Sequence, residues 1–339
     1  MALPVLAKSW QYDVNITISA QGSVQATSKR LLRTIVDTLI SGSSPYAWEV
    51  RGSSDGVSTS ASYLWTDDSK IVYNSAGNNH SWVHLRQSAF GGSPGFEIII
   101  DCTGPAVKGT CTIVMVNAGG FSGGTITNRP SAVNEIVVDS SSLSTVDVNC
   151  AIHVLRSTDG ECSRVVVWDS SSNISNLLII DKPANAVSGW TNPGYVVSMC
   201  LNSSGYANSY NNLLVLGSPS IPSYGGKKSY GSSSMDLMFT GEGMGYKATG
   251  TVDYETGICA ALSLASTSND LTSEWPMFPI GLASLTSGNV GRHGSVFDLW
   301  WRPNGTSATG ETFPATGSAQ FVAMGDLILP WNGTTPVIA

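Results

Sequence analysis

Apolar side chains recur at helical spacing in one stretch of this chain, residues 23–41. Leu32, Ile35, Val36, Leu39 and Ile40 follow one another in steps that place them on one face of an α-helix. Polar residues lie mostly off this face and are expected to face water: Ser28, Lys29, Arg30, Arg33, Asp37 and Thr38. Ser23 or Thr27 can cap the start of the helix, and Gly42 suits a left-handed residue after its end.

Most of the remaining pattern predicts β-strands. Apolar and polar residues alternate over the second half of 4–18 and over 145–156, as on a half-buried strand. Ser157 to Gly160 has the composition of a hairpin turn that leads into 163–169. Nearly continuous apolar runs at 96–101 and 111–117 predict adjacent antiparallel strands buried on both faces. Further strands are expected at 46–51, 62–65, 70–73, 81–87, 177–181, 194–202, 213–217, 236–239, 246–254, 257–265, 296–301 and 320–331.

These elements predict a mainly β protein of the α+β class with antiparallel sheets, of the kind found in β-sandwiches. Parallel winding would need a crossover helix after most strands, and the pattern contains only one helix. We expect helix 23–41 to pack on a sheet built from 46–51, 81–87, 96–101 and 111–117. Two glycine pairs and a proline within 119–133 predict a boundary between domains 1–128 and 129–339. The Ser/Gly/Tyr-rich stretch 202–234 is expected to form a surface loop of the second domain.

Charge is sparse and slightly acidic. Charged residues make up 12% of the 339 residues, about half the usual share, and the net charge is −7. The few basic residues do not cluster into a phosphate-binding groove, so nucleic acid is not an expected partner. No apolar run is long enough to span a membrane, and the start of the sequence lacks the features of a secretory signal. We therefore expect synthesis in a cytoplasm, with the six cysteines reduced and mostly buried; a Cys102–Cys111 disulfide across a turn remains open.

Candidate catalytic motifs are weak. Ser54 and Ser93 each sit in a G-x-S-x-G match, but neither is followed by the helix that a nucleophile elbow requires. His80 and His84 have HxxxH spacing, yet four residues along a strand separate two side chains by roughly 13 Å. Many carboxylates could serve a glycosidase, and no spacing selects a pair of them. The sequence predicts no catalytic residue, no metal ligand set and no cofactor, and hence a protein that is not an enzyme.

Aromatic residues are the candidates for contact with partners. Four tyrosines lie in the 202–234 loop, whose composition is typical of recognition loops: Tyr206, Tyr210, Tyr224 and Tyr230. They could bind a ligand, contact another subunit or fold back onto a sheet. The C-terminal segment supplies four more candidate interface residues: Trp300, Trp301, Phe321 and Trp331.

Three segments carry a resemblance to a known group of proteins. They are KSWQYDVNITIS with the following RLLRTIVDTLI and YAWEVRGSSDG, then NSAGNNHSWVHLRQSAFGGSPGFEIIIDCTG, and finally GRHGSVFDLWWRP with GSAQFVAMGDLILPWNGTTPVIA. In these segments the chain resembles virion structural proteins of tailed bacteriophages and prophages, while residues 130–280 show little of it. The resemblance implies a multi-copy component of a neck, tail, fibre or capsid surface, and it transfers no catalytic residues.

Function is therefore expected to be structural. The leading hypothesis is a non-enzymatic virion component, associated with the neck or tail, that binds copies of itself and other virion proteins. The alternative is a carbohydrate-binding receptor module on a tail or head fibre, which would bind a host-surface glycan during attachment. A depolymerase or peptidase would need an acid pair or a catalytic triad that the sequence does not assemble.

Overall fold

The computed structural model shows a mainly β protein with antiparallel sheets and, among the described residues, one α-helix. This confirms the predicted mainly β class with one N-terminal helix. The structure describes residues 6, 8–54, 59–60, 66–72, 81–91, 96–102, 111–116, 121–122, 125–126, 135–138, 149–169, 174–182, 194–201, 213–216, 235–239, 278–286, 289–292, 298, 300–301, 312–313, 320–324, 327–332 and 337–338.

The sheet that contains the first strand is called the middle sheet here. Its seven strands lie in the order β14-β13-β12-β11-β10-β1-β22, and every neighbouring pair is antiparallel except β1 with β22. Their bounds are β1 Trp10–Ile18, β10 Cys150–Ser157, β11 Cys162–Asp169, β12 Ile174–Asp181, β13 Tyr195–Leu201, β14 Leu213–Leu216 and β22 Val337–Ile338.

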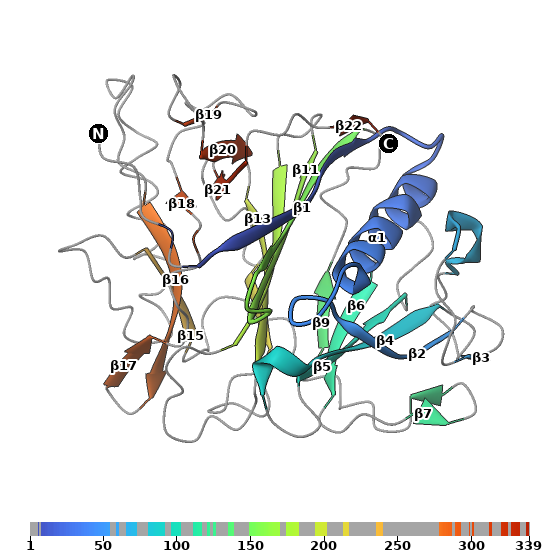
Figure 1. Cartoon of the computed structure of the whole chain (residues 1–339), viewed down its shortest axis with the longest axis horizontal. Helices are drawn as coiled ribbons and strands as arrows, with labels where there is room; N and C mark the ends of the chain where they lie inside the picture. The colour runs from blue at the N-terminus through green and yellow to red at the C-terminus, as the bar shows by residue number, and fades with distance from the viewer. Residues whose placement is uncertain are drawn as a thin grey trace.

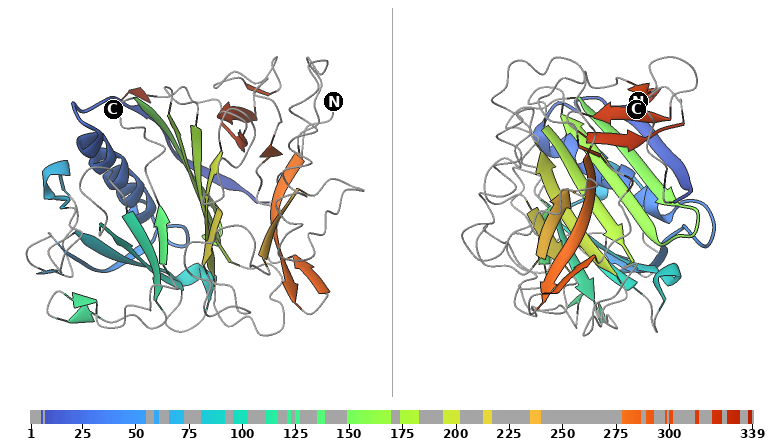
Figure 2. Two further views of the ribbon diagram at one scale, coloured as in Figure 1. Left: turned by 180° about the vertical axis from the view of Figure 1, so that it is seen from behind. Right: turned by 90° about the vertical axis from the view of Figure 1, so that its left-hand side faces the viewer.

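Two further sheets lie on opposite sides of the middle sheet (Figures 1 and 2). The first sheet has the order β3-β2-β4-β5-β6-β9: β2 Glu49–Ser54, β3 Thr59–Ser60, β4 Trp82–Gln87, β5 Phe96–Asp101, β6 Cys111–Val116 and β9 Glu135–Val138. The third sheet has the order β15-β16-β18-β21-β20-β19, with β17 paired to β16: β15 Met235–Phe239, β16 Phe278–Thr286, β17 Asn289–Arg292, β18 Trp300–Trp301, β19 Thr312–Phe313, β20 Phe321–Met324 and β21 Leu327–Pro330. A small hairpin joins β7 Phe121–Ser122 to β8 Thr125–Ile126.

Helix α1 runs over Val24–Ile40, one residue shorter at each end than the periodic stretch predicts. The Ser23 hydroxyl accepts a hydrogen bond from the backbone N–H of Ala26 at 3.1 Å, so Ser23 is the N-cap. Gly42 follows the helix with φ +86°, as predicted for a left-handed residue at this position. A Cβ there would also lie 2.5 Å from the Tyr46 ring, so a larger residue would need this ring to shift in addition to the backbone strain.

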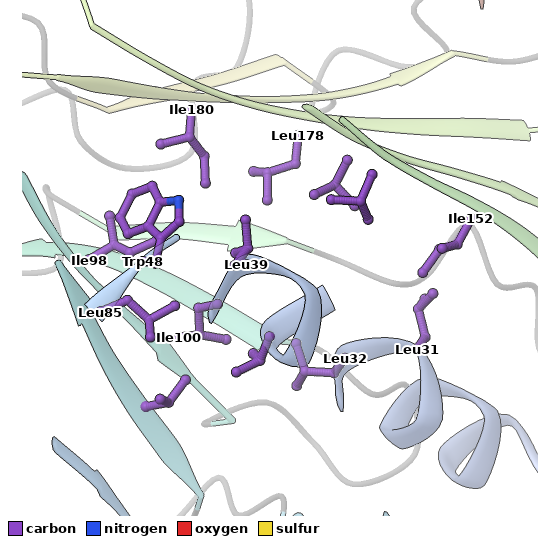
Figure 3. Packing of buried hydrophobic residues seen from close by; sticks show 14 of the residues in the cluster. Leu31, Leu32, Leu39, Trp48, Leu85, Ile98, Ile100, Ile152, Leu178 and Ile180 are labelled. Carbon is purple, nitrogen blue, oxygen red and sulfur yellow. The ribbon is translucent and has the colours of Figure 1, made fainter. Parts of the chain in front are cut away.

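The apolar face of α1 belongs to one large buried cluster. Leu31, Leu32, Val36 and Leu39 are buried in it, together with side chains from the first and the middle sheet. Figure 3 shows Leu39 between Leu85 and Ile100 on one side and Leu178 and Ile180 on the other. Ile35 and Ile40 are partly buried against the same cluster. The cluster therefore joins residues from three parts of the chain that are far apart in sequence.

Two of the helix residues expected to face water are buried instead. Ser28 is 2% exposed and Thr38 is 6% exposed. Thr38 tolerates burial because its hydroxyl donates to the backbone carbonyl of Thr34 at 2.6 Å. The predicted helix face is therefore too narrow: α1 has neighbours on more than one side, so its buried surface extends past the five-residue apolar stripe.

The strand predicted at 70–73 is wrong over the residues that the structure describes. Asp68–Lys70 form a 3₁₀ turn, η1, and the Asp67 carboxylate caps it by accepting the backbone N–H of Ser69 at 2.7 Å. Asp68 then binds two arginines of α1, Arg30 at 2.6 Å and Arg33 at 2.9 Å. Local capping and these ion pairs outweigh the β propensity of Ile71 and Val72.

The strands expected at 62–65, 246–254 and 257–265 lie outside the described residues. Strand β16, Phe278–Thr286, was not predicted, because Pro279 and Gly281 interrupt its apolar pattern. The β10–β11 hairpin is confirmed, with Gly160 at φ +76° and its N–H bonded to the Ser157 carbonyl at 2.9 Å. A Cβ on Gly160 would lie 2.2 Å from the Pro45 carbonyl oxygen, so this turn packs directly on the loop that follows α1.

Strand β1 lies in the interior of the middle sheet, between β10 and β22. It pairs with β10 over its whole length, from Trp10 opposite Ser157 to Ile18 opposite Cys150, with one irregularity between Tyr12 and Val14. The predicted division into domains 1–128 and 129–339 stays a prediction. With these bounds β1 belongs to the first domain, whereas the other strands of the middle sheet belong to the second.

Candidate functional site

Polar side chains from distant parts of the chain meet at the end of the middle sheet where the β10–β11 turn lies. Residues 8–10, called the N-terminal latch here, lead into β1 at this place. The Lys8 ammonium donates to Asp159 at 2.6 Å and to Glu161 at 2.9 Å, and Lys182 donates to Glu161 at 2.7 Å. The backbone N–H of Thr158 also donates to the Ser9 carbonyl at 2.9 Å. The latch is thus bound to the turn by side chains and by backbone.

The other side of the latch is bound to Asp298. One carboxylate oxygen, Oδ2, accepts the backbone N–H of Lys8 at 2.9 Å and the indole N–H of Trp10 at 2.8 Å. Asp298 is fully buried, and its φ of +53° is in the left-handed region that few residues other than glycine, asparagine and aspartate adopt. This contact joins residues that are 288 and 290 positions apart.

A buried ion pair lies behind Trp10. Arg164 of β11 and Asp181 of β12 are 0% exposed, and the two guanidinium nitrogens Nη1 and Nη2 each contact one carboxylate oxygen, the second at 2.8 Å. The Arg164 guanidinium also lies over the Trp10 ring, 5.2 Å from its centroid. A bidentate, stacked arginine of this kind holds its neighbours in one geometry.

Cys162 lies in the same region and its chemistry is that of a buried thiol. Burial raises the pKa of Cys162, and the neighbouring Asp181 carboxylate raises it further. The thiolate, which is the nucleophilic form of cysteine, is therefore disfavoured at neutral pH. Burial works against a charged Lys8 as well, but the hydrogen bonds with Asp159 and Glu161 raise the pKa of Lys8 above its usual value. The arrangement keeps the lysine charged and the cysteine neutral, which suits a structural contact.

A second polar pair lies in the first sheet. His84 of β4 and Glu97 of β5 are 1% and 4% exposed, with His84 Nε2 3.2 Å from Glu97 Oε2. Burial lowers the pKa of His84, and the Glu97 carboxylate opposes this shift. His84 lies on a strand, as expected, and His80 lies outside the described residues. Within the described ranges no three His, Cys, Asp or Glu side chains are grouped to hold a metal ion.

His153 of β10 provides a test of pH dependence. Burial lowers the pKa of His153 to about 4, against about 6.5 in an unfolded chain. Between these values the unfolded state binds the proton and the folded state does not, so stability is complete above pH 6.5 and is lost as the pH falls. We therefore expect the free energy of unfolding to fall by about 3 kcal/mol through His153 as the pH is lowered from 6.5 to 4.

Urea unfolding of wild type and His153→Gln across this pH range measures the effect. Glutamine does not titrate, so the variant should lose less stability on acidification than the wild type does. His84 remains in both proteins, and the difference between the two curves therefore isolates His153. Parallel curves would contradict a buried, neutral His153.

The predicted interface residues have different positions in the structure. Trp300 and Trp301 form β18, which begins two residues after Asp298. This strand pairs with β16 and with β21. Phe321 is fully buried within the chain, and Trp331 is half-buried, with its backbone N–H bonded to the Gln320 carbonyl at 2.7 Å. Tyr206, Tyr210, Tyr224 and Tyr230 lie outside the described residues. Contact of any of the eight with a partner stays a prediction.

The serine motifs gain no support from the described residues. Ser54 is the last residue of β2 and pairs with Thr59 of β3, so a strand follows it where a nucleophile elbow has a helix. Ser93 lies outside the described residues. For Cys111 the structure describes the backbone and not the side chain. The Cys102–Cys111 pairing therefore remains open.

Sequence reasoning missed the residues of the latch region, and it also missed the buried Arg156 of β10, for which a signal was present. Arg156 continues the alternating series Cys150, Ile152 and Val154 at the next inward position. An arginine at such a position predicts a buried, bonded guanidinium. The contacts of Lys8 and Trp10 with Asp298 have no comparable sequence signal, because nearly the whole chain separates them.

Comparison with known proteins gives no family for this chain: no family model matches it, and no curated protein matches it. No helix in the described part of the chain is both long and apolar enough to cross a membrane.

Proposed function

We propose that this protein is a non-enzymatic structural component of a phage virion, associated with the neck or tail, which assembles in many copies. The observation that carries the proposal is the scarcity of charge, 12% of residues, combined with how the described charges are used. Arg164, Asp181 and Lys8 are bound within the chain, as are Arg30 and Arg33. A surface that is rich in Ser, Thr, Asn and Gly can contact other subunits with little desolvation of charge.

The resemblance of three segments to phage virion proteins supports the same class, and it includes both the helix region and residues 296–301. We include in the proposal that α1 packs on the first sheet as the centre of an N-terminal part, 1–128. Leu32, Val36 and Leu39 share a buried cluster with Leu85 and Ile98, which supports this packing. The proposed partners are copies of this chain and other virion proteins, with the virion as the site of action after synthesis in the host cytoplasm.

Mass photometry of the purified full chain tests the proposal. We expect oligomers, and we expect Trp331→Ala to reduce their fraction severalfold because a half-buried tryptophan is a typical anchor of an interface. Asn332→Ala is the matched control, since Asn332 is the exposed neighbour and carries no aromatic surface. A wild-type protein that is strictly monomeric and never enters a particle would overturn the proposal.

A carbohydrate-binding receptor module is the second candidate, and one observation favours it. Residues 202–234 combine four tyrosines with Ser, Gly and Asn, the composition of recognition loops. A glycan array of the full chain separates the two candidates. Binding that is lost in Tyr206→Ala or Tyr224→Ala and kept in Trp331→Ala would favour the receptor module.

A further inference from the structure

Two cysteines occupy facing register positions at one end of the strand pair β5–β6 in the first sheet. The described register of this pair ends with Asp101 opposite Thr112. One further step along both strands places Cys102, the residue after β5, opposite Cys111, the first residue of β6. Residues directly opposite one another on antiparallel strands lie on the same face of a sheet. The backbone therefore places these two cysteine positions next to each other.

The backbone hydrogen bond of Cys102 shows which kind of cross-strand pair this is. Its N–H donates to the Ser81 carbonyl at 2.9 Å, on the β4 side of β5. Because the N–H and C=O of one strand residue point to the same neighbour, Cys102 is in a non-hydrogen-bonded position with respect to β6. Facing residues at such positions have Cα atoms about 4.5 Å apart. A disulfide needs a Cα separation of about 4.4–6.8 Å, so this pair of positions meets its requirement.

Cys150 is the alternative partner for Cys102, because both residues belong to the same large buried cluster and both are fully buried. Cys150 lies on β10 of the middle sheet, however, and Cys102 belongs to the first sheet. Facing sheets pack about 10 Å apart, and a disulfide cannot join Cα atoms more than about 7 Å apart. The backbone therefore favours Cys111 over Cys150.

We propose that Cys102 and Cys111 are a modification site, at which a disulfide forms when the protein leaves the reducing cytoplasm. The oxidant is a low-molecular-weight disulfide. One cysteine thiolate attacks a sulfur of the oxidant, forms a mixed disulfide and releases one small thiolate. The other cysteine thiolate then attacks the protein sulfur of the mixed disulfide and releases the second small thiolate. The two cysteines lose two electrons to the oxidant, and the released thiolates take up the two protons.

The cross-link joins β5 to β6 at the end where residues 103–110 connect them. Ile98 and Ile100 of β5 belong to the buried cluster that also contains Leu39 of α1. A bond at this end limits the separation of the two strands beside that cluster. Because Cys102 is fully buried, the oxidant reaches it only when the end of the strand pair opens locally. The site goes beyond the proposed function, and only its timing, after release from the host, rests on that function.

Peptide mapping of the purified full chain after incubation with oxidised glutathione tests the site. Remaining thiols are alkylated in denaturant, and trypsin cleavage after Lys108 separates the two cysteines into different peptides. We expect a linked pair of peptides that contain Cys102 and Cys111, with loss of two of the six thiols. Cys150→Ala is the matched control, because Cys150 is equally buried in the same cluster and its variant should still form the cross-link. Cys111→Ala should form no such cross-link.

Three results of the mapping would overturn the site: six remaining thiols, a cross-link from Cys102 to another cysteine, or a glutathione adduct without a cross-link. Hydrogen exchange measures the effect of the bond on the sheet. We expect amides of residues 98–101 and 112–115 to exchange about tenfold slower in the oxidised protein than after reduction with dithiothreitol. Equal exchange in the two forms would show that the bond does not hold the strands together.

Alkylation of thiols in intact host cells and in released particles tests the timing. We expect reduced Cys102 and Cys111 in the cells and the cross-link in the particles. A cross-link that is already complete in the cytoplasm, or one that is missing from the particles, would contradict the timing. A protein that enters no particle would overturn the proposed function, whereas the mapping of the purified chain would still decide the disulfide.

Discussion

Arg156→Met is expected to lower the free energy of unfolding by about 4 kcal/mol, one of the two largest effects of a single substitution in this chain. Arg156 is 1% exposed on β10, and its guanidinium reaches the end of α1. Nη1 lies 2.9 Å from the Leu39 carbonyl, 2.8 Å from the Ser41 carbonyl and 3.3 Å from the Tyr46 carbonyl. Nη2 donates to the Ser41 hydroxyl at 3.1 Å.

These contacts matter because a helix ends with carbonyl groups that have no partner inside the helix and carry partial negative charge. The last turn of α1 contains no basic residue. Arg156 supplies the positive charge from another element, and its guanidinium also lies 4.9 Å from the centroid of the Tyr46 ring. Methionine fills a similar volume but donates no hydrogen bond to the Ser41 carbonyl. The Leu39 and Tyr46 carbonyls keep one donor each, the Trp48 backbone N–H and the Gln87 amide, so the loss comes from the Ser41 contacts and from the buried charge at the helix end.

Urea unfolding followed by far-UV circular dichroism measures this loss. Arg156→Lys keeps the charge without the planar fork and should recover only part of the stability. Arg51→Met is the matched control, because Arg51 is 42% exposed and its removal should change stability by less than about 0.5 kcal/mol. A loss in Arg156→Met no larger than in Arg51→Met would show that Arg156 does not hold the end of α1.

The buried pair of Arg164 and Asp181 gives the second large effect, and the loss of stability is not expected to double when both partners are removed. Arg164→Met or Asp181→Asn alone should cost about 3–5 kcal/mol, because each leaves one charge buried without its counter-ion. The double variant should cost about as much as one single variant, since no uncompensated charge remains. The pair is 1% and 0% exposed, so little solvent screening reduces these values.

A double-mutant cycle in urea measures the coupling between the two residues. We expect a coupling of about 3 kcal/mol, and the exposed pair of Arg86 and Glu49 provides the comparison. Its side chains are 22% and 48% exposed, so the same cycle on Arg86→Met and Glu49→Gln should give less than about 1 kcal/mol. Additive losses at Arg164 and Asp181 would mean that the pair is held by its other neighbours and not by mutual attraction.

Elements whose signals are local could be predicted from the sequence. The apolar stripe with Ser23 and Gly42 defines α1 to within one residue at each end, because capping and periodicity both act within a few residues. The hairpin turn at 157–160 and the neighbouring runs at 96–101 and 111–116 are of the same kind, and their pairing is antiparallel as predicted.

Features that depend on distant residues could not be predicted. The burial of Ser28 and Thr38 depends on what packs around α1, and the 3₁₀ turn at Asp68–Lys70 is fixed in part by Arg30 and Arg33 of the helix. The site region shows the same limit more strongly. Lys8 and Asp298 have no pattern that links them, because a contact between residues at opposite ends of a chain leaves no periodic trace in a single sequence.

The position of β1 has a consequence for synthesis on the ribosome. Its antiparallel partner begins at Cys150 and its parallel partner at Val337, so β1 leaves the ribosome long before either exists. At translation rates of 5–20 residues per second the delay before the β10 sequence is complete is roughly 7–30 s. Throughout that time an alternating apolar strand has both edges exposed and can pair with other nascent chains. The order of synthesis therefore exposes β1 to pairing with other chains before its own partners exist, and slower initiation should favour folding by keeping nascent chains apart.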